Sequence, residues 1–296
     1  MRIVSLLPSA TEIVYALGLG DSLVGVTHEC DWPPEAEHKP HVSVSVLPES
    51  ASPAEVDRLV SSSIADGEPI YRLDERTVRE LQPDLVLTQD LCAVCAVPSG
   101  QVSEALEVLG CDAEVVSMDP RSLDEVLECI ARVGEVTGRE RQARSVLQSL
   151  RRRLEVITER VAGSTRPRTF ALEWSDPPFN AGHWVPGMIE TAGGKAVLGS
   201  SGTPSARVTW EQIAAAAPDV VVFMPCGYDV EAASREGLLL LERPELMAAS
   251  QFFAVDASAY FSRPGPRLVD GVEILASLLH PDAVGEHVPS GARRLR

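Results

Sequence analysis

Residues 139–161 read RERQARSVLQSLRRRLEVITERV and contain neither glycine nor proline. Their apolar side chains recur every three or four residues, as on one face of a helix. At a rise of 1.5 Å per residue, such a helix would span roughly 35 Å. Its length predicts a stiff connector between two lobes, with the arginines at 151–153 on a solvated face. The apolar stripe consists of Val146, Leu150, Leu154, Ile157 and Val161.

On both sides of this helix, short apolar runs alternate with amphipathic stretches, which is typical of α/β units around a parallel sheet. Strands are expected at residues 3–7, 23–27, 85–88, 114–117, 169–173, 220–224 and 253–256. Helices are expected at residues 11–17, 77–81, 102–109, 122–137, 185–191, 210–217 and 268–279. The tail from residue 281 is expected to be a loop.

One pattern occurs in both halves of the chain. Val78 precedes Pro83-Asp84 and a buried strand in the same way that Ile213 precedes Pro218-Asp219 and a buried strand. The repetition predicts two copies of one supersecondary plan. The expected fold is therefore α/β, with two α/β lobes of mostly parallel sheet, one long α-helix joining them and a ligand cleft between the lobes. The predicted domains are an N-terminal lobe (1–120), connecting helices (121–165) and a C-terminal lobe (166–296).

Charge and composition exclude several classes of protein. The 296 residues include 43 acidic and 26 basic side chains, for a formal net charge of −17. This balance disfavours nucleic-acid binding, which usually needs a basic surface. No run approaches the ~20 apolar residues of a membrane span. The apolar run at residues 3–7 is too short for a signal peptide, so we expect a cytoplasmic protein, or a periplasmic or cell-surface one if a signal segment has been removed.

The motifs of common enzyme families are missing from the sequence. We find no G-x-S-x-G elbow, no P-loop, no H-E-x-x-H and no G-x-G-x-x-G after a strand. We therefore expect a binding protein with no catalytic residues and no catalytic cofactor. In open α/β sheets, ligands bind beyond the carboxyl ends of the strands, and the loops expected there are rich in aromatic residues. Such loops suit a large, flat and partly apolar ligand.

One constellation could hold a metal. His28-x-Cys30 and Cys92-x-x-Cys95 both follow expected strands, and thiolates with imidazole can bind zinc or an iron–sulfur cluster. A redox-active dithiol and reduced thiols lining a pocket are the alternatives. His183, beside Gly182, is either a hydrogen-bonding loop residue or a further metal ligand.

Several stretches resemble one family in order and spacing. Residues 2–13 (RIVSLLPSATEI) and 24–34 (VGVTHECDWPP) resemble the vitamin B12-binding proteins of ABC importers, and more broadly the iron-chelate and cobalamin substrate-binding proteins. Residues 83–87 (PDLVL), 177–182 (PPFNAG), 193–194 (GG) and 261–267 (FSRPGPR) extend the resemblance over nearly the whole chain. The family fold has two α/β lobes, one long helix between them and the ligand held between the lobes.

The resemblance implies non-enzymatic binding of cobalamin or a related corrinoid. The alternatives are a binder of iron-siderophore, haem or another metal chelate on the same scaffold, and a cytosolic metal or redox protein that uses Cys30, Cys92 and Cys95. Family positions for ligand contact fall on Arg263, Tyr260, Trp32, Gln89, Glu29 and Ser205. Further ligand contacts are expected from Asp90, Trp174, Trp184 and Arg207, and His28, His183 or a thiol could ligate cobalt.

The resemblance also implies an ABC permease as partner. Members of the family dock through one acidic residue in each lobe, seven residues before the proline of the Pro-Asp turn. Glu211 occupies this position in the second half, whereas Arg76 occupies it in the first, next to Asp74 and Glu75. A reversed charge at a docking position weakens recognition, so Arg76 argues against an importer's receptor.

Overall fold

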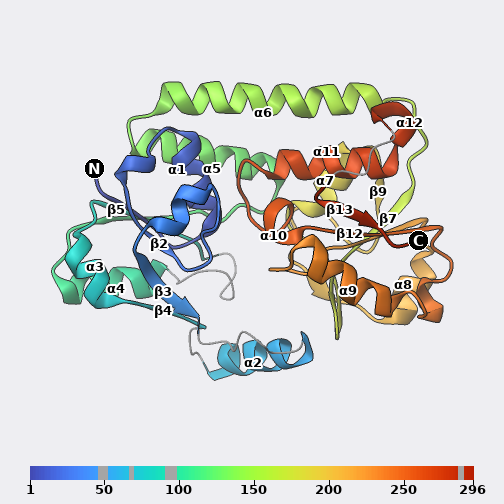
Figure 1. The fold of residues 1–296 in the computed structure, drawn as a ribbon, viewed down its shortest axis with the longest axis horizontal. Helices are drawn as coiled ribbons and strands as arrows, with labels where there is room; N and C mark the ends of the chain where they lie inside the picture. Colours follow the sequence, from blue (N-terminus) through green and yellow to red (C-terminus); the bar gives the residue numbers. More distant parts are fainter. Residues whose placement is uncertain (46–52, 67–69, 91–98, 286–289) are drawn as a thin grey trace. The chain divides into compact units, whose positions relative to one another are not determined.

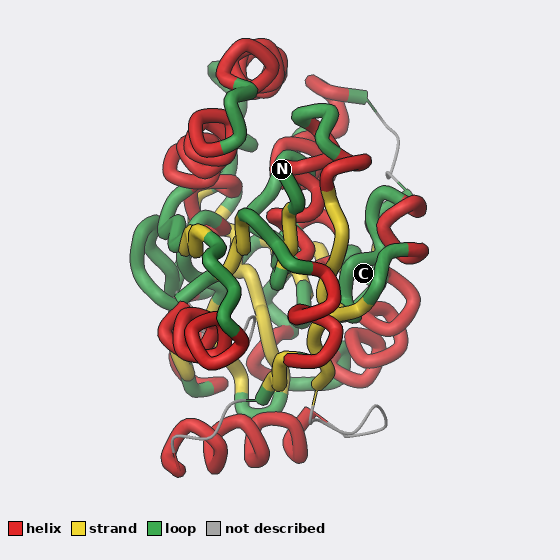
Figure 2. Tube along the Cα trace, turned by 90° about the vertical axis from the view of Figure 1, so that its left-hand side faces the viewer, coloured by secondary structure: helices red, strands yellow, loops and turns green. Residues whose placement is uncertain are grey.

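The computed structural model describes residues 1–45, 53–66, 70–90, 99–285 and 290–296. It divides into two compact units. Unit 1 comprises residues 1–119 and 128–146, and unit 2 comprises residues 120–127 and 147–296. In each unit, helices pack beside a sheet of mostly parallel strands (Figures 1 and 2). The α/β class predicted from the alternating pattern is therefore confirmed.

The described residues of unit 1 form a six-stranded sheet in the order β4-β3-β2-β1-β5-β6. All neighbouring strands are parallel except β3 and β4. The strands are β1 (Ile3–Ser5), β2 (Leu23–Thr27), β3 (His41–Ser45), β4 (Tyr71–Leu73), β5 (Leu85–Thr88) and β6 (Glu114–Ser117). The helices are α1 (Pro8–Ala16), α2 (Pro53–Asp66), α3 (Glu75–Leu81) and α4 (Ser99–Leu109), with short 3₁₀ turns at Gly20–Ser22 and Pro34–His38. Helix α5 (Leu123–Val136) has residues 128–136 in unit 1 and residues 123–127 in unit 2.

The described residues of unit 2 form a sheet in the order β10-β8-β7-β11-β12-β13, and β9 pairs with β7. The central strands β7, β11 and β12 are parallel, whereas β8, β10 and β13 run antiparallel to their neighbours. The strands are β7 (Arg168–Ser175), β8 (Pro178–Asn180), β9 (Lys195–Ala196), β10 (Ala206–Arg207), β11 (Val220–Phe223), β12 (Gln251–Val255) and β13 (Ala292–Arg294). The helices are α7 (Val185–Thr191), α8 (Trp210–Ala216), α9 (Val230–Leu240), α10 (Ala257–Tyr260), α11 (Leu268–Leu279) and α12 (Pro281–Val284), with a 3₁₀ turn at Pro244–Leu246.

The long helix predicted at residues 139–161 is α6 (Glu140–Val161). Leu150, Ile157 and Val161 of its apolar stripe are buried. The prediction of a solvated arginine run was wrong for Arg153, because this side chain is half-buried and holds Glu273 on α11 with hydrogen bonds of 2.7 and 2.8 Å. The helix therefore packs through a charged contact as well as an apolar one.

The repeated Pro-Asp pattern corresponds to the same contacts in each unit. In unit 1, the backbone N–H of Arg2 donates to the Asp84 carboxylate (2.6 Å), and the Asp84 N–H donates to the Arg2 carbonyl (2.8 Å). In unit 2, Arg168 and Asp219 make the same reciprocal pair, at 2.8 Å in both directions. We call each pair an Arg–Asp brace. Each brace joins the amino-terminal ends of two parallel strands, β1 with β5 and β7 with β11.

Some expected elements differ from the structure. The tail from residue 281 is not a loop throughout, because α12 begins there and β13 adds to the edge of the sheet through Val255 and Ala292. The sequence pattern also missed β3, α2, β4 and α9. The strands β3 and β4 have partly exposed residues and lack the continuous apolar run of a central strand.

Candidate functional site

In unit 1, the loop after β2 brings three polar and aromatic side chains together. The Tyr71 hydroxyl, from β4, donates a 2.9 Å hydrogen bond to the Glu29 carboxylate. The rings of His28 and Tyr71 lie 5.6 Å apart. The Trp32 side chain follows on the same loop and is 46% exposed. His28, Glu29 and Trp32 thus lie in the loop that leaves the carboxyl end of β2, and their contact with a ligand stays a prediction. Tyr71 is a neighbour that the sequence missed because β4 was not predicted.

Gln89 and Asp90 follow β5 but differ in what they can offer to a ligand. Gln89 is buried. The Asp90 carboxylate accepts hydrogen bonds from the backbone N–H and the hydroxyl of Ser99, at 2.7 and 2.5 Å. Burial opposes ionisation of Asp90, but the hydrogen bonds from Ser99 outweigh it and lower the pKa of Asp90. This carboxylate therefore anchors the start of α4, a role that the sequence did not indicate.

Of the three cysteines proposed to bind a metal, the structure describes Cys30. Cys30 is buried, and its Sγ lies 3.1 Å from the Thr11 hydroxyl of α1. Cys92 and Cys95 lie outside the described residues. Within the described ranges, no three His, Cys, Asp or Glu side chains are grouped closely enough to hold a metal ion. Cys30 therefore packs inside unit 1, as free cysteine often does.

In unit 2, an aromatic side chain near the carboxyl end of β7 meets one that follows β11. The rings of Trp174 and Tyr228 are 5.9 Å apart and edge to face at 72°. Burial and the nearby charge of Glu236 raise the pKa of Tyr228 to about 12, so its phenol is neutral at pH 7. The buried Nε1 of Trp174 has no hydrogen-bond partner among the described residues. Tyr228 follows the expected strand at 220–224, and that position was the available signal for it.

A buried carboxyl lies beside this aromatic pair. Glu173 lies between Leu172 and Trp174, where the pairing register of β7 with β8 shifts. Such a bulge redirects the side chains beside it. Burial raises the pKa of Glu173 to about 7, although a hydrogen bond from Ser205 acts in the opposite direction. Glu173 Oε2 is buried and has no hydrogen-bond partner within the described part of the chain. Sequence reasoning missed Glu173, because nothing in its residue type distinguishes it from an exposed glutamate.

The loop that presents His183 is held by its backbone. The His183 N–H donates to the Thr203 carbonyl at 2.6 Å, and its carbonyl accepts from Gly202 at 3.0 Å. The preceding Gly182 N–H donates to the Ser205 hydroxyl at 3.1 Å. A Cβ at Gly182 would overlap the backbone of Ser205, so only glycine fits. Burial and the charge of Arg121 lower the pKa of His183, and its imidazole is therefore neutral at pH 7.

Trp184 packs in the core and offers no polar group to a ligand. Its side chain is 6% exposed, and its Nε1–H donates to the Phe261 carbonyl at 2.7 Å. Its ring lies 5.6 Å from that of His183. Trp184 is therefore buried next to His183, and its expected contact with a ligand stays a prediction.

The remaining expected contacts surround this region. The exposed Arg207 guanidinium lies 5.6 Å from the centre of the Phe179 ring. Tyr260 and Arg263 are half-buried on and after α10. Arg267 lies 5.8 Å from the centre of the Tyr260 ring. These groups leave a mixture of aromatic faces and guanidinium groups at the carboxyl end of the unit 2 sheet.

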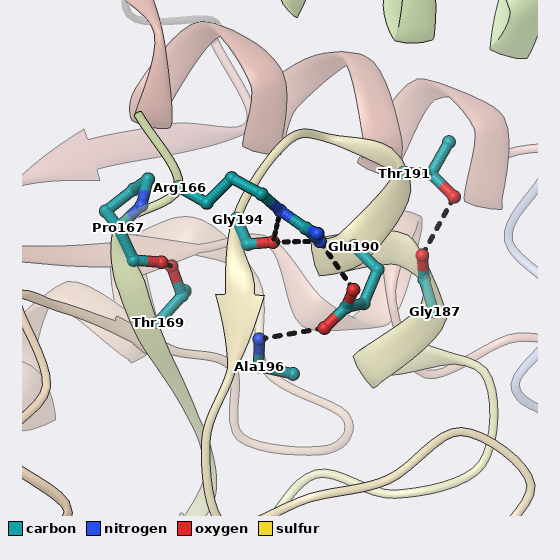
Figure 3. A network of polar contacts seen from close by, with 8 residues as sticks. All are labelled: Arg166, Pro167, Thr169, Gly187, Glu190, Thr191, Gly194 and Ala196. Atoms are coloured by element: carbon teal, nitrogen blue, oxygen red, sulfur yellow. Dashed lines mark hydrogen bonds and ion pairs between the residues drawn. The ribbon is translucent and has the colours of Figure 1, made fainter. Parts of the chain in front are cut away.

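A polar network fixes the helix that follows the His183 loop (Figure 3). Arg166 donates to the Gly194 carbonyl, through Nε at 3.1 Å, and pairs with the Glu190 carboxylate at the end of α7. Glu190 also accepts from the backbone N–H of Ala196, at 3.4 Å. The network ties the far end of α7 to β9 and to the start of β7, so the His183 loop has a fixed base.

The expected docking residues occupy equivalent helix starts. Asp74 precedes α3, and its carboxylate accepts from the Thr77 N–H at 3.1 Å and from the Thr77 hydroxyl at 2.8 Å. These hydrogen bonds lower the pKa of Asp74. Glu75 and Glu211 are exposed in the first turns of α3 and α8. Glu75 and Glu211 are therefore exposed acidic groups at these helix starts, whereas Asp74 caps α3. A hydrogen bond with the Thr209 side chain lowers the pKa of Glu211.

Comparison with known proteins decides the family. The model of the periplasmic binding protein family matches residues 3–251. This chain belongs to the periplasmic binding protein family. Its membership agrees with the resemblance inferred from residues 2–13 and 24–34, and it places the chain among binding proteins rather than enzymes.

Individual relatives of this periplasmic binding protein agree with the family assignment. It is 27% identical, over 94% of its length and 88% of theirs, to the vitamin B12-binding protein of Vibrio cholerae. It is 26% identical, over 90% and 82%, to the vitamin B12-binding protein of Yersinia pestis. The crystal structure of a periplasmic haem-binding protein from Pseudomonas aeruginosa has the same fold, with a TM-score of 0.70, 21% identity and coverage of 95% of this chain and 93% of that one.

The comparisons leave two expectations without support. A cytoplasmic location is at odds with a family of periplasmic binding proteins. The hypothesis of a cytosolic metal or redox protein is likewise not supported. Among the described residues, no helix combines the length and apolar character needed to cross a membrane.

Proposed function

We propose that this periplasmic binding protein binds cobalamin or a related corrinoid as its cargo. The observation that supports it most is the similarity, over 94% of the chain, to a protein named vitamin B12-binding protein. Corrinoids are large and partly apolar, and Trp174 with Tyr228 offers aromatic faces to such a ligand. The neutral imidazole of His183 is in the protonation state that a metal ligand needs.

Each unit contains candidate contacts of its own. In unit 1 they are His28, Glu29, Trp32 and Gln89, with Asp90 acting indirectly through Ser99. In unit 2 they are Trp174, His183, Arg207, Tyr260 and Arg263. Guanidinium groups suit the phosphate and amide oxygens of the ligand because they donate paired hydrogen bonds.

The test is calorimetric titration with cyanocobalamin, aquocobalamin, haem and a ferric hydroxamate. We expect a cobalamin dissociation constant well below ~100 μM. Trp174→Ala should weaken cobalamin binding at least tenfold. Trp210→Ala is the matched control, because Trp210 stacks on Arg243 at 3.8 Å on another part of unit 2. Binding of haem or the hydroxamate with no binding of either cobalamin would refute the corrinoid proposal and favour a metal-chelate binder.

Axial ligation of cobalt has a separate readout. His183→Ala or His28→Ala should change the visible spectrum of bound aquocobalamin, because replacing an imidazole ligand alters the cobalt transitions. The control His38→Ala removes an exposed histidine from the Pro34–His38 turn. An unchanged spectrum in both of the first two variants would show that neither histidine binds cobalt.

We infer that the protein works outside the cytoplasm and delivers its ligand to an ABC permease. The family membership supports this location. Glu211 supplies an exposed acidic group at the docking position of unit 2. Glu211→Arg should weaken binding to the permease in detergent, whereas Glu242→Arg, also exposed in unit 2, should not. Equal effects of the two substitutions would argue against docking through Glu211.

A further inference from the structure

A groove of about 410 Å³ lies in unit 2, apart from the carboxyl end of the sheet. Its first wall is the C-terminal half of α6, where Arg152, Val156 and Arg160 recur every four residues and therefore lie along one row of the helix. Its second wall is formed by Ser277 of α11 and Val284 of α12. The groove thus combines guanidinium groups with apolar side chains.

The charges in the groove leave two arginines available. Arg153 and Glu273 also line it, but Arg153 is held by hydrogen bonds of 2.7 and 2.8 Å to Glu273 and by an ion pair with Asp270. Arg152 has a 3.4 Å contact with Glu155, in which both side chains are more than 60% exposed (65% and 63%). Such surface pairs contribute little. Arg160 is exposed and makes no ion pair or hydrogen bond within the described part of the chain.

The lining of the groove has three arginines and one glutamate, and Glu155 and Asp270 contact two of these arginines from its edge. The protein has a formal net charge of −17, so the exposed Arg160 attracts anions that the rest of the molecule repels. Guanidinium groups match the geometry of phosphate oxygens and donate to them in pairs. The Ser277 hydroxyl adds a small donor, and Val156 with Val284 can cover an apolar part next to the phosphate.

We propose that this groove binds a phosphate group, either as a free phosphate or as the headgroup of an anionic lipid. Arg152 and Arg160 hold the phosphate oxygens. The apolar side chains of the groove meet the glycerol and the first carbons of the acyl chains when the phosphate belongs to a lipid. The site is independent of the proposed corrinoid site, since none of its residues is among the proposed corrinoid contacts.

The experiment is calorimetric titration at low ionic strength with inorganic phosphate, dihexanoyl phosphatidylglycerol and dihexanoyl phosphatidylcholine, each below its micelle concentration. The test variant is Arg152→Gln/Arg160→Gln. The matched control is Arg144→Gln/Arg151→Gln, which removes the same charge from exposed positions of α6 outside the groove. Circular dichroism and thermal unfolding show that both variants fold.

We expect the test variant to bind phosphate or phosphatidylglycerol at least tenfold more weakly than the unmodified protein, and the control to stay within twofold. Phosphatidylglycerol that binds at least tenfold more tightly than inorganic phosphate identifies a lipid headgroup, and equal affinities identify free phosphate. Equal weakening in both variants would overturn the proposal, as would equal binding of phosphatidylcholine and phosphatidylglycerol or no binding at millimolar concentrations.

Discussion

Replacement of Glu173 by glutamine should remove a pH dependence from the stability of unit 2. The pKa of Glu173 rises from an ordinary value of 4.5 to about 7 because the carboxyl is buried. The folded protein therefore holds this proton more tightly than the unfolded chain does. The resulting stability is fully present below pH 4.5 and is lost as the pH rises through about 7.

The size of the effect follows from that shift. A difference of about 2.5 pKa units, at about 1.4 kcal/mol per unit, corresponds to at most about 3 kcal/mol of unfolding free energy. Glu173→Gln keeps a hydrogen-bonding group beside Ser205 but cannot ionise. At pH 8.5 the variant should be more stable than the unmodified protein by up to about 3 kcal/mol, and near pH 4 the two should be similar.

The assay is urea unfolding between pH 4 and pH 8.5, followed by tryptophan fluorescence. Trp174, Trp184 and Trp210 all lie in unit 2, so the signal reports mainly on that unit. Glu159→Gln, at an exposed position of α6, is the control and should keep the slope of the unmodified protein. Parallel curves for Glu173→Gln and the unmodified protein across this range would refute the reasoning, because the buried carboxyl would then titrate at its ordinary pKa.

Three further predictions concern contacts that hold the fold. Arg153→Ala leaves two carboxylates on α11 without their partner and should lower the unfolding free energy by about 1–2 kcal/mol in urea titrations. The control Arg151→Ala, on the solvated face of α6, should change the unfolding free energy by less than about 0.5 kcal/mol. Asp84→Ala and Asp219→Ala each remove one Arg–Asp brace and should cost similar amounts, about 1 kcal/mol each, in chemical denaturation; a loss in only one of them would contradict the equivalence of the braces. Gly182→Ala should displace the loop on which it lies and weaken cobalamin binding at least tenfold by calorimetry, and unchanged affinity would show that this loop does not touch the ligand.

The sequence predicted the central elements well because their signals are local. A helix such as α6 needs only apolar spacing and the absence of glycine and proline, and the strands β2 and β5 are continuous apolar runs between turn residues. The edge strands β3 and β4 were missed because half-exposed strands have weaker patterns. The domain boundaries stay a prediction.

The candidate site was less predictable, because burial and hydrogen bonding depend on residues distant in sequence. His28 follows β2 as predicted, whereas Trp174 lies within β7, near its carboxyl end, and not after it. Position relative to a strand could not show that Trp184 donates its Nε1–H to the Phe261 carbonyl, or that burial raises the pKa of Glu173. These properties follow from the tertiary fold and have no signature in a short motif.

The Arg–Asp braces have a consequence for how the sequence of this protein can evolve. Each brace ties two strands together at their amino-terminal ends, whereas the loops with the proposed ligand contacts leave the opposite ends of the sheets. Substitutions that alter ligand preference therefore fall far from the contacts that keep the strands paired. Such a separation lets descendants of one chain acquire new cargo by loop variation, while selection for folding acts on a different edge of the molecule.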